Sequence, residues 1–225
     1  MLALKLGLSL VSTPRLGGWS PDDETSLQAW YQNAVGIDLN GSDVSEWEDS
    51  STNGYNMVQA TATEQPAYSA GVLTFVSADS NNLQTTGQVS LSGDFTLGIV
   101  FNPSISAPGT ILGDNTTSNE FIKYTSTTNF RIKMDGTIAN IPLDSGTFAD
   151  DYIVVTRASN VLTLYKDGVA QSTTPTLAGT ADIDAIGVRH PTDTNPYAGT
   201  IKEIQIYTSS SAGLTANVND RLATL

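Results

Sequence analysis

Two Asp-Gly pairs, each between segments in which apolar and polar residues alternate, constrain the fold of this chain more than any other feature. Alternation with a period of two places every second side chain on the same face of a β-strand. Asp-Gly favours the positive φ angles of type I′ turns, whose twist matches that of two paired strands. We therefore expect two tight hairpins, one at 129–134 and 137–141 around Asp135-Gly136, the other at 160–166 and 169–172 around Asp167-Gly168.

Other segments predict further strands. The clearest core strand runs from 95 to 101, where one face carries large apolar side chains and a proline follows: Phe95, Leu97, Ile99, Phe101 and Pro103. Alternation also predicts strands at 152–157, 183–188 and 200–207. Gly, Ser, Thr, Asn and Asp are abundant while Lys and Glu are scarce, a composition that favours turns and strands over helices. The chain is therefore predicted to be all-β.

Length and composition favour a single domain built on packing alone. With 225 residues, of which 39% are hydrophobic, the chain can fill the core of one large β-sandwich. It contains no cysteine, which excludes disulfides, thiolate zinc sites and cysteine nucleophiles. One helix is predicted, at 216–225 after a Thr215 cap, because the apolar residues Leu214, Val218, Leu222 and Leu225 have helical spacing.

The N-terminus carries a leucine at every second position: Leu2, Leu4, Leu6, Leu8 and Leu10. As a strand, this segment places all five on one face, and burying each leucine contributes about 1.5–3 kcal/mol. We therefore expect 1–17 to be an assembly strand with a partner, and 18–225 to be the domain. A cleaved signal peptide is the alternative, but Lys5 interrupts the apolar run and no Ala-x-Ala site precedes Pro14. No segment approaches the length of a membrane span.

Charge is unevenly distributed. The formal net charge is −13, and no Lys or Arg occurs between Arg15 and Lys123, a stretch that holds thirteen Asp and Glu residues. Such a surface repels phosphate backbones, so nucleic-acid binding is not expected. The acidic residues are interpreted either as a solubility surface suited to a salty medium or as ligands for divalent cations.

Several segments resemble laminin-G-like, concanavalin A-like jelly-roll domains. That family has a Trp, a spacer and then Trp-x-Asp-x-Ser-Gly-Asn-Gly-x-Asn, and here Trp30 and Trp47 begin the two parts. Ser51-Thr52 stands where the family pattern has Ser-Gly. The segments at 94–97, 162–168 and 199–207 match later family signatures in the same order. The resemblance covers the chain from Leu27 to its end.

The resemblance implies an antiparallel β-sandwich, with one concave sheet, that binds carbohydrate or protein. Such domains with a final helix also resemble modules in virion proteins of tailed bacteriophages. The first hypothesis is therefore a structural or appendage protein of a virion, assembled in the host cytoplasm and displayed on the virion surface. Its partners would be other virion proteins or further copies of itself, for example in a trimer, and the outward jelly roll would bind host-surface glycans. The alternative is an independent, extracellular carbohydrate-binding or adhesion module of a bacterial surface protein.

Catalysis is not expected. The resembling laminarinase group carries Glu-x-Asp-x-x-Glu on one strand, and this chain has no such motif. The nearest acidic pairs, Glu46 with Glu48 and Asp182 with Asp184, are interpreted as solvated side chains. His190 is the only histidine, and no serine lies in a nucleophile-elbow pattern.

A polar loop provides the candidate glycan site, with donors, acceptors and an aromatic ring close together: Arg189, His190, Asp193, Asn195 and Tyr197. Sugar recognition needs fixed polar groups for hydroxyls and an apolar face for C–H surfaces. An ordinary polar connection is the alternative. Trp30 and Trp47 are interpreted as core anchors rather than stacking platforms.

A Ca²⁺ site is a further hypothesis, since members of this family often bind Ca²⁺ at sandwich edges. The candidate ligands are Asp43, Asp49, Asn53 and Asn56. Their spacing does not match an EF-hand loop, and oxygen-rich turns also occur without a metal. No other cofactor is expected.

Overall fold

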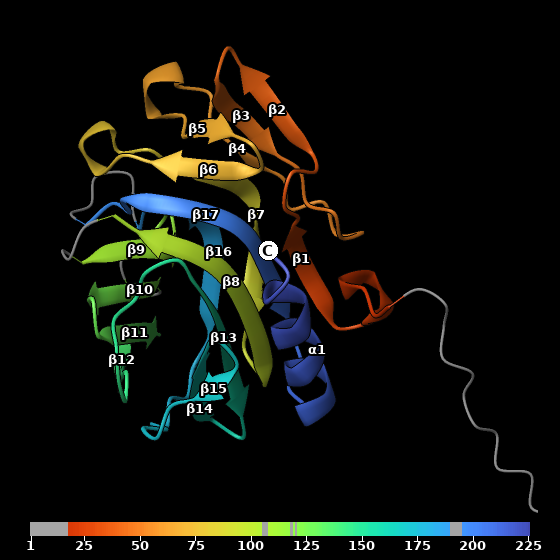
Figure 1. Ribbon diagram of the computed structural model, residues 1–225, viewed down its shortest axis with the longest axis vertical. Helices are drawn as coiled ribbons and strands as arrows, with labels where there is room; N and C mark the ends of the chain where they lie inside the picture. Colours follow the sequence, from red (N-terminus) through yellow and green to blue (C-terminus); the bar gives the residue numbers. More distant parts are fainter. Residues whose placement is uncertain (1–17, 105–107, 118, 120, 190–194) are drawn as a thin grey trace, which may run out of the picture.

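The structure is a computed structural model that describes residues 18–104, 108–117, 119, 121–189 and 195–225. Within these residues the chain forms seventeen strands, one α-helix and three short 3₁₀ helices, at Pro21–Asp23, Ala62–Glu64 and Ser77–Asp79 (Figure 1). All pairings between the strands are antiparallel, so the predicted all-β fold is confirmed.

The first layer of the sandwich is centred on two long strands that pair along most of their lengths. Its strands are β1 (Leu27–Tyr31), β5 (Ala67–Ser69), β6 (Val72–Phe75), β8 (Phe95–Pro103), β13 (Asp151–Ala158), β14 (Val161–Lys166), β15 (Val169–Ala170) and β17 (Gly199–Tyr207). One edge of β17 pairs with β8, and its other edge pairs first with β6 and then with β1. β8 continues the layer through β13 to β14 and β15.

The second layer follows the order β4-β7-β16-β9-β10-β11-β12. Its strands are β4 (Met57–Val58), β7 (Leu83–Leu91), β9 (Gly109–Gly113), β10 (Phe121–Ser126), β11 (Asn129–Met134), β12 (Thr137–Pro142) and β16 (Ala181–Ile186). A small hairpin, β2 (Ile37–Asn40) with β3 (Asp43–Trp47), joins the layers, because β3 pairs with both β4 and β5.

The main core lies between the two layers. Alternating residues of β8 point into it, and Phe95, Leu97 and Ile99 pack there with Ile122 of β10 and Ile132 of β11. Each of these side chains is at most 1% exposed. The period-two alternation in the sequence therefore identifies the inner face correctly.

Both Asp-Gly hairpins form as predicted. Asp135 and Gly136 have φ angles of 45° and 79°, and Asp167 and Gly168 have φ angles of 48° and 78°. Positive φ at both central residues is the mark of a type I′ turn. The sequence therefore predicts both turns at the residues where the structure has them.

The C-terminal helix α1 (Ala212–Leu222) begins four residues before the predicted start. Ser211, not Thr215, is its cap, because the Ser211 hydroxyl accepts a hydrogen bond from the Leu214 backbone N–H at 3.1 Å. The predicted apolar face is correct, since Leu214, Val218 and Leu222 are buried in a second core on the outside of the first layer. Figure 1 shows α1 beside β1 and β8. No helix in the described part of the chain is long and apolar enough to cross a membrane.

Candidate functional site

The two described ends of the predicted glycan loop, Arg189 and Asn195, lie beside β10 and β9. The Arg189 guanidinium carbon lies 5.3 Å from the centre of the Phe121 ring at the start of β10. The Asn195 carbonyl accepts a hydrogen bond from the Thr110 N–H at 3.1 Å. Two predicted residues of this loop, His190 and Asp193, lie outside the described residues. The structure thus brings the two ends of the loop against the second layer.

The prediction that Tyr197 belongs to the glycan site is wrong. Its ring is fully buried in the core and cannot stack on a sugar. The ring packs edge-on against Phe75 and Tyr124, with ring centres 5.7 and 6.1 Å away. Its hydroxyl donates to the Thr200 carbonyl at 2.9 Å, and burial raises the pKa of Tyr197 well above its usual value. The signal in the sequence is that Tyr197 lies two residues before the core strand β17, which favours a buried ring.

A cavity of about 350 Å³ lies beside Tyr197, where β6, β8 and β17 run next to one another. Phe75, Val76 and Ala198 provide apolar walls, and the remaining lining residues are Thr74, Ser77, Ala78, Asn102, Ser104, Gly199 and Thr200. Gly199 is required here, because its φ is +142° and a Cβ would overlap the Asn102 carbonyl oxygen. Apolar walls with a few polar groups are typical of ligand sites.

The sequence analysis missed this cavity. The polar residues of the cavity come from three separate strands. Thr200 of β17 lies opposite Asn102 of β8 on one edge and opposite Thr74 of β6 on the other edge. A possible signal is the polar pair Asn102 and Ser104 around Pro103, directly after an apolar strand. The partner strands could not be inferred from that signal.

The Asp49 carboxylate organises the turn that carries most of the candidate Ca²⁺ ligands. It is 8% exposed. Oδ1 accepts hydrogen bonds from the N–H groups of Trp30 (2.8 Å) and Ser51 (2.9 Å), and Oδ2 accepts from the Ser51 hydroxyl (2.7 Å) and the Tyr55 N–H (3.0 Å). Protein donors thus occupy both oxygens, and the carboxylate stabilises the turn.

The other candidate Ca²⁺ ligands are also used within the protein. Asn53 donates its side-chain N–H groups to the carbonyls of residues 27 and 28, and the Asn56 amide oxygen accepts from the Asp49 N–H at 3.0 Å. Asp43 begins β3, whereas Asp49 follows its end. Across the described residues, no group of three or more His, Cys, Asp or Glu side chains could hold a metal ion. The Ca²⁺ site stays a prediction.

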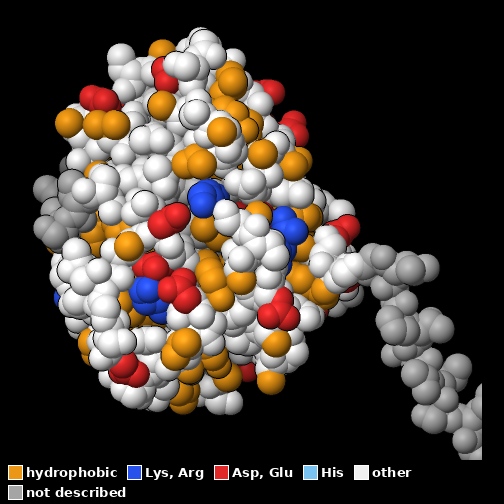
Figure 2. Space-filling model, in the orientation of Figure 1, with side chains coloured by type: hydrophobic (Ala, Val, Ile, Leu, Met, Phe, Trp, Pro, Cys, Tyr) orange, Lys and Arg blue, Asp and Glu red, His pale blue; other side chains and the backbone are white. Residues whose placement is uncertain are grey.

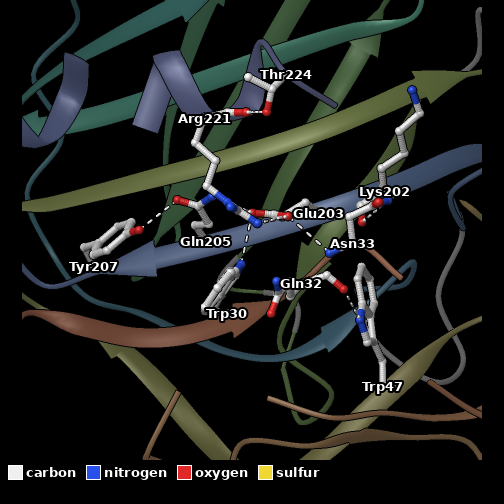
Figure 3. Close-up of polar contacts among 10 residues, drawn as sticks. All are labelled: Trp30, Gln32, Asn33, Trp47, Lys202, Glu203, Gln205, Tyr207, Arg221 and Thr224. Atoms are coloured by element: carbon white, nitrogen blue, oxygen red, sulfur yellow. Dashed lines mark hydrogen bonds and ion pairs between the residues drawn. The ribbon is translucent and has the colours of Figure 1, made fainter. Parts of the chain in front are cut away.

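A buried ionic cluster lies under α1 (Figure 3). Glu203 on β17 is fully buried and accepts from the Trp30 indole N–H at 3.0 Å, the Gln205 amide at 2.6 Å and the Asn33 backbone N–H at 3.1 Å. Arg221 of α1 pairs with the same carboxylate, and its guanidinium carbon lies 4.9 Å from the Trp30 ring centre. Every acceptor position of Glu203 is satisfied by the protein, so the cluster fastens α1 and β1 to β17.

Trp30 and Trp47 are core anchors, as the sequence analysis expected. Trp47 is fully buried, and its indole N–H donates to the Gln32 carbonyl at 3.2 Å. Trp30 is 6% exposed. Neither ring is available as a stacking platform for a sugar.

The interpretation of Asp182 and Asp184 as solvated side chains is wrong for Asp184. It is 4% exposed and accepts a hydrogen bond from the Asn115 backbone N–H. Burial, together with the nearby carboxylates of Asp114 and Asp182, raises the pKa of Asp184 to about 6. Asp114 itself is 2% exposed and accepts from Thr116 and Thr117. Of the other predicted pair, Glu48 is exposed and Glu46 accepts from Asn56.

The strand pairings define a two-layer antiparallel β-sandwich domain. No protein-family model and no curated protein sequence matches this chain. Among solved structures it is similar to domain 4 of AbnA, a GH43 extracellular arabinanase from Geobacillus stearothermophilus in complex with arabinotriose. The TM-score is 0.57 at 16% identity, over 88% of this chain and 98% of that one.

A second similar structure is the Trypanosoma rangeli sialidase in complex with 2,3-difluorosialic acid. The TM-score is 0.53 at 13% identity, over 96% of this chain and 35% of the sialidase. This chain therefore spans about a third of that enzyme's length. These likenesses show the fold, and a concanavalin A-like jelly roll fits them.

Proposed function

We propose that this domain is a non-catalytic carbohydrate-binding module whose sugar site is the cavity between β6, β8 and β17. The observation that carries the proposal is the lining of that cavity, in which the exposed side chains of Val76 and Ala78 provide apolar surface beside Asn102 and Thr200. Sugars present C–H faces and hydroxyls together, which require this mixture. A volume of about 350 Å³ lies within the usual range of small-molecule sites.

The fold supports the same proposal. The arabinanase domain, which this chain matches over 98% of that domain's length, was solved with arabinotriose. A shared fold by itself carries no ligand from one protein to another, so the argument depends on the lining of the cavity. The non-catalytic part of the proposal is supported by the sequence, which lacks the Glu-x-Asp-x-x-Glu motif of the laminarinase group.

The test is a glycan array with the full chain, followed by calorimetry on the best neutral glycan. Ala78 lines the cavity and is exposed, so Ala78→Trp fills the cavity at little cost to folding. Ala170→Trp, at an exposed position of β15, is the matched control. We expect Ala78→Trp to weaken binding at least tenfold and Ala170→Trp to leave it unchanged. An array without any bound glycan, or equal binding by both variants, would overturn the proposal.

We further propose that the module faces outward from a bacteriophage virion, as part of a decoration, fibre or tail component. This setting is supported by the alternating leucines, a segment outside the described residues that as a strand would need an apolar partner. The alternative is an extracellular adhesion module of a bacterial surface protein. The oligomeric state of the full chain separates the two, as described in the Discussion.

A further inference from the structure

A second cavity adjoins the first at the end of β6. Its volume is about 430 Å³, compared with about 350 Å³ for the first cavity. Val76 lies in the wall of both cavities, and its side chain is 44% exposed. The other residues of the second cavity on which the argument depends are Asp43, Ala62, Gln65, Asp79 and Asn81. The two cavities therefore meet at one exposed apolar side chain.

Hydrogen bonds fix the segment at 76–79, which lines both cavities. The Asn81 amide oxygen accepts from the Val76 backbone N–H at 2.8 Å, and the Asn81 amide donates to the Gln65 carbonyl at 3.1 Å. The Asp79 N–H donates to the Val76 carbonyl at 3.1 Å. Asn81 and Gln65 are only 4% and 6% exposed. Because its walls are held in place, such a site loses little conformational entropy when a ligand binds.

The second cavity is acidic. Asp43 is half-buried and accepts from the Ser42 hydroxyl at 3.3 Å, whereas the exposed Asp79 carboxylate has no hydrogen bond or ion pair with any described residue. Every residue that lines this cavity lies between positions 43 and 81, in the part of the sequence without Lys or Arg. Figure 2 shows acidic and apolar side chains over β2 to β5, at the top of the view. The cavity therefore favours a positively charged ligand group.

The first cavity differs from the second in charge. Its polar lining consists of hydroxyl and amide side chains, among them Asn102, Ser104 and Thr200, and none of its lining residues is acidic or basic. Groups of this kind suit the hydroxyls of a neutral sugar unit. The two cavities thus favour different groups of one ligand.

We propose that the two cavities together bind an amino oligosaccharide, a chain of sugar units that carry protonated amino groups. One unit lies in the first cavity, and the ammonium group of a neighbouring unit pairs with Asp43 and Asp79 in the second. Val76 packs against the C–H surface between the two units. Linked units bind more tightly than separate units, because the second contact forms within one complex. The inference rests on the proposed function, since it keeps the first cavity as a sugar site.

The experiment compares probes that share a skeleton and differ in charge or length. Calorimetry with the full chain, in mildly acidic buffer, uses the β-1,4-linked glucosamine trimer, the glucosamine monomer and cellotriose. Cellotriose has a hydroxyl in place of each amino group of the trimer. Trilysine is the probe for binding by charge alone.

Two pairs of variants locate the binding. The charge variant is Asp43→Asn with Asp79→Asn, and its control is Asp22→Asn with Asp220→Asn, which removes the same charge at exposed positions of the first 3₁₀ helix and α1. Ala62 is exposed and lines the second cavity, so Ala62→Trp fills that cavity without a change of charge. Ala170→Trp is again the matched control. Circular dichroism melting checks that each variant is folded.

We expect the glucosamine trimer to bind at least tenfold more tightly than either cellotriose or the monomer. The charge variant and Ala62→Trp should each lose at least tenfold in affinity for the trimer, and their controls less than twofold. The charge variant should bind cellotriose as the parent does. Equal binding of the trimer and cellotriose, equal losses in the controls, or equally tight binding of trilysine would overturn the inference.

Failure of this inference is distinguishable from failure of the proposed function. If a neutral glycan binds and is lost in Ala78→Trp, while neither the amino groups nor Ala62→Trp make a difference, only the role of the second cavity is wrong. If the array and both trimers show no binding, both proposals are overturned.

Discussion

Arg221 and Glu203 form a two-point ion pair, with Nε 2.6 Å from Oε1 and Nη2 2.9 Å from Oε2. The carboxylate is fully buried, whereas the Arg221 side chain is 22% exposed. The pair therefore joins the last helix to the central strand of the first layer, and its charge is balanced inside the protein.

Arg221→Met should destabilise the domain by about 3–5 kcal/mol, because it leaves the Glu203 carboxylate buried without its cation. Chemical denaturation measures the change. Arg221→Met combined with Glu203→Gln should recover part of the loss, since the buried group is then neutral. A double variant that is less stable than the single variant would contradict this account.

Gly98→Ala should weaken the attachment of α1. A Cβ at this position would lie 2.6 Å from Val218 Cγ1 and 3.0 Å from Leu222 Cδ1, too close for any side-chain carbon. We expect a loss of about 1–3 kcal/mol from overpacking, with partial rescue by Val218→Ala. Thermal melting of the two variants checks both expectations, and unchanged stability of Gly98→Ala would show that α1 can shift freely.

Asp184 should make stability depend on pH. Its pKa is about 6 in the folded protein and is about 3.9 in an unfolded chain, so the folded state holds the proton more tightly. Stability should therefore fall as the pH rises from about 4 to about 6.

Asp184→Asn removes this effect. The variant should be more stable than the parent at pH 8, on the order of 1–3 kcal/mol, and the difference should shrink towards pH 4. Denaturation at a series of pH values measures it. A difference that stays constant with pH would mean that Asp184 keeps an ordinary pKa.

Asp49→Ala should destabilise the turn at residues 49–56 by about 2–4 kcal/mol, because its four hydrogen-bond donors lose their acceptor. The loss should be the same with Ca²⁺ or with a chelator. If Ca²⁺ raises the melting temperature of the parent but not of the variant, Asp49 is a metal ligand, and the expectation that the loss is independent of Ca²⁺ is wrong.

Replacing Leu4, Leu6 and Leu8 with Ser should abolish assembly while the jelly roll stays folded, if the leucine strand joins neighbouring chains. Light scattering measures the mass of the parent and the variant at equal concentration, and circular dichroism checks the fold. A monomeric parent, or unfolding of the variant as a monomer, would favour the independent adhesion module.

Local patterns in the sequence predicted much of the fold. The hairpins at Asp135 and Asp167, the inner face of β8 and the apolar face of α1 were all correct, because each depends on residues close together in the chain. The helix start was wrong by four residues, since Ser211 competes with Thr215 as a cap and only the backbone shows which hydroxyl accepts the bond.

The candidate site was predicted less well. Arg189 and Asn195, at the ends of the predicted loop, do lie at the second layer. Tyr197, however, belongs to the core, and the cavity depends on three strands that meet only in the folded chain. The pairing of Lys123 with Arg131 likewise depends on the register of β10 and β11.

The sequence by itself determined the all-β class, the tight turns and the faces of the strands, because backbone φ preferences and side-chain alternation are local properties. The tertiary structure alone decided which polar groups meet. Trp30 and Glu203 share a hydrogen bond across 173 residues, and β10, β11 and Arg189 place three cations around the Phe121 ring. The burial, pKa and ligand contacts of a side chain depend on such distant neighbours, and strand pairing determines which neighbours they are.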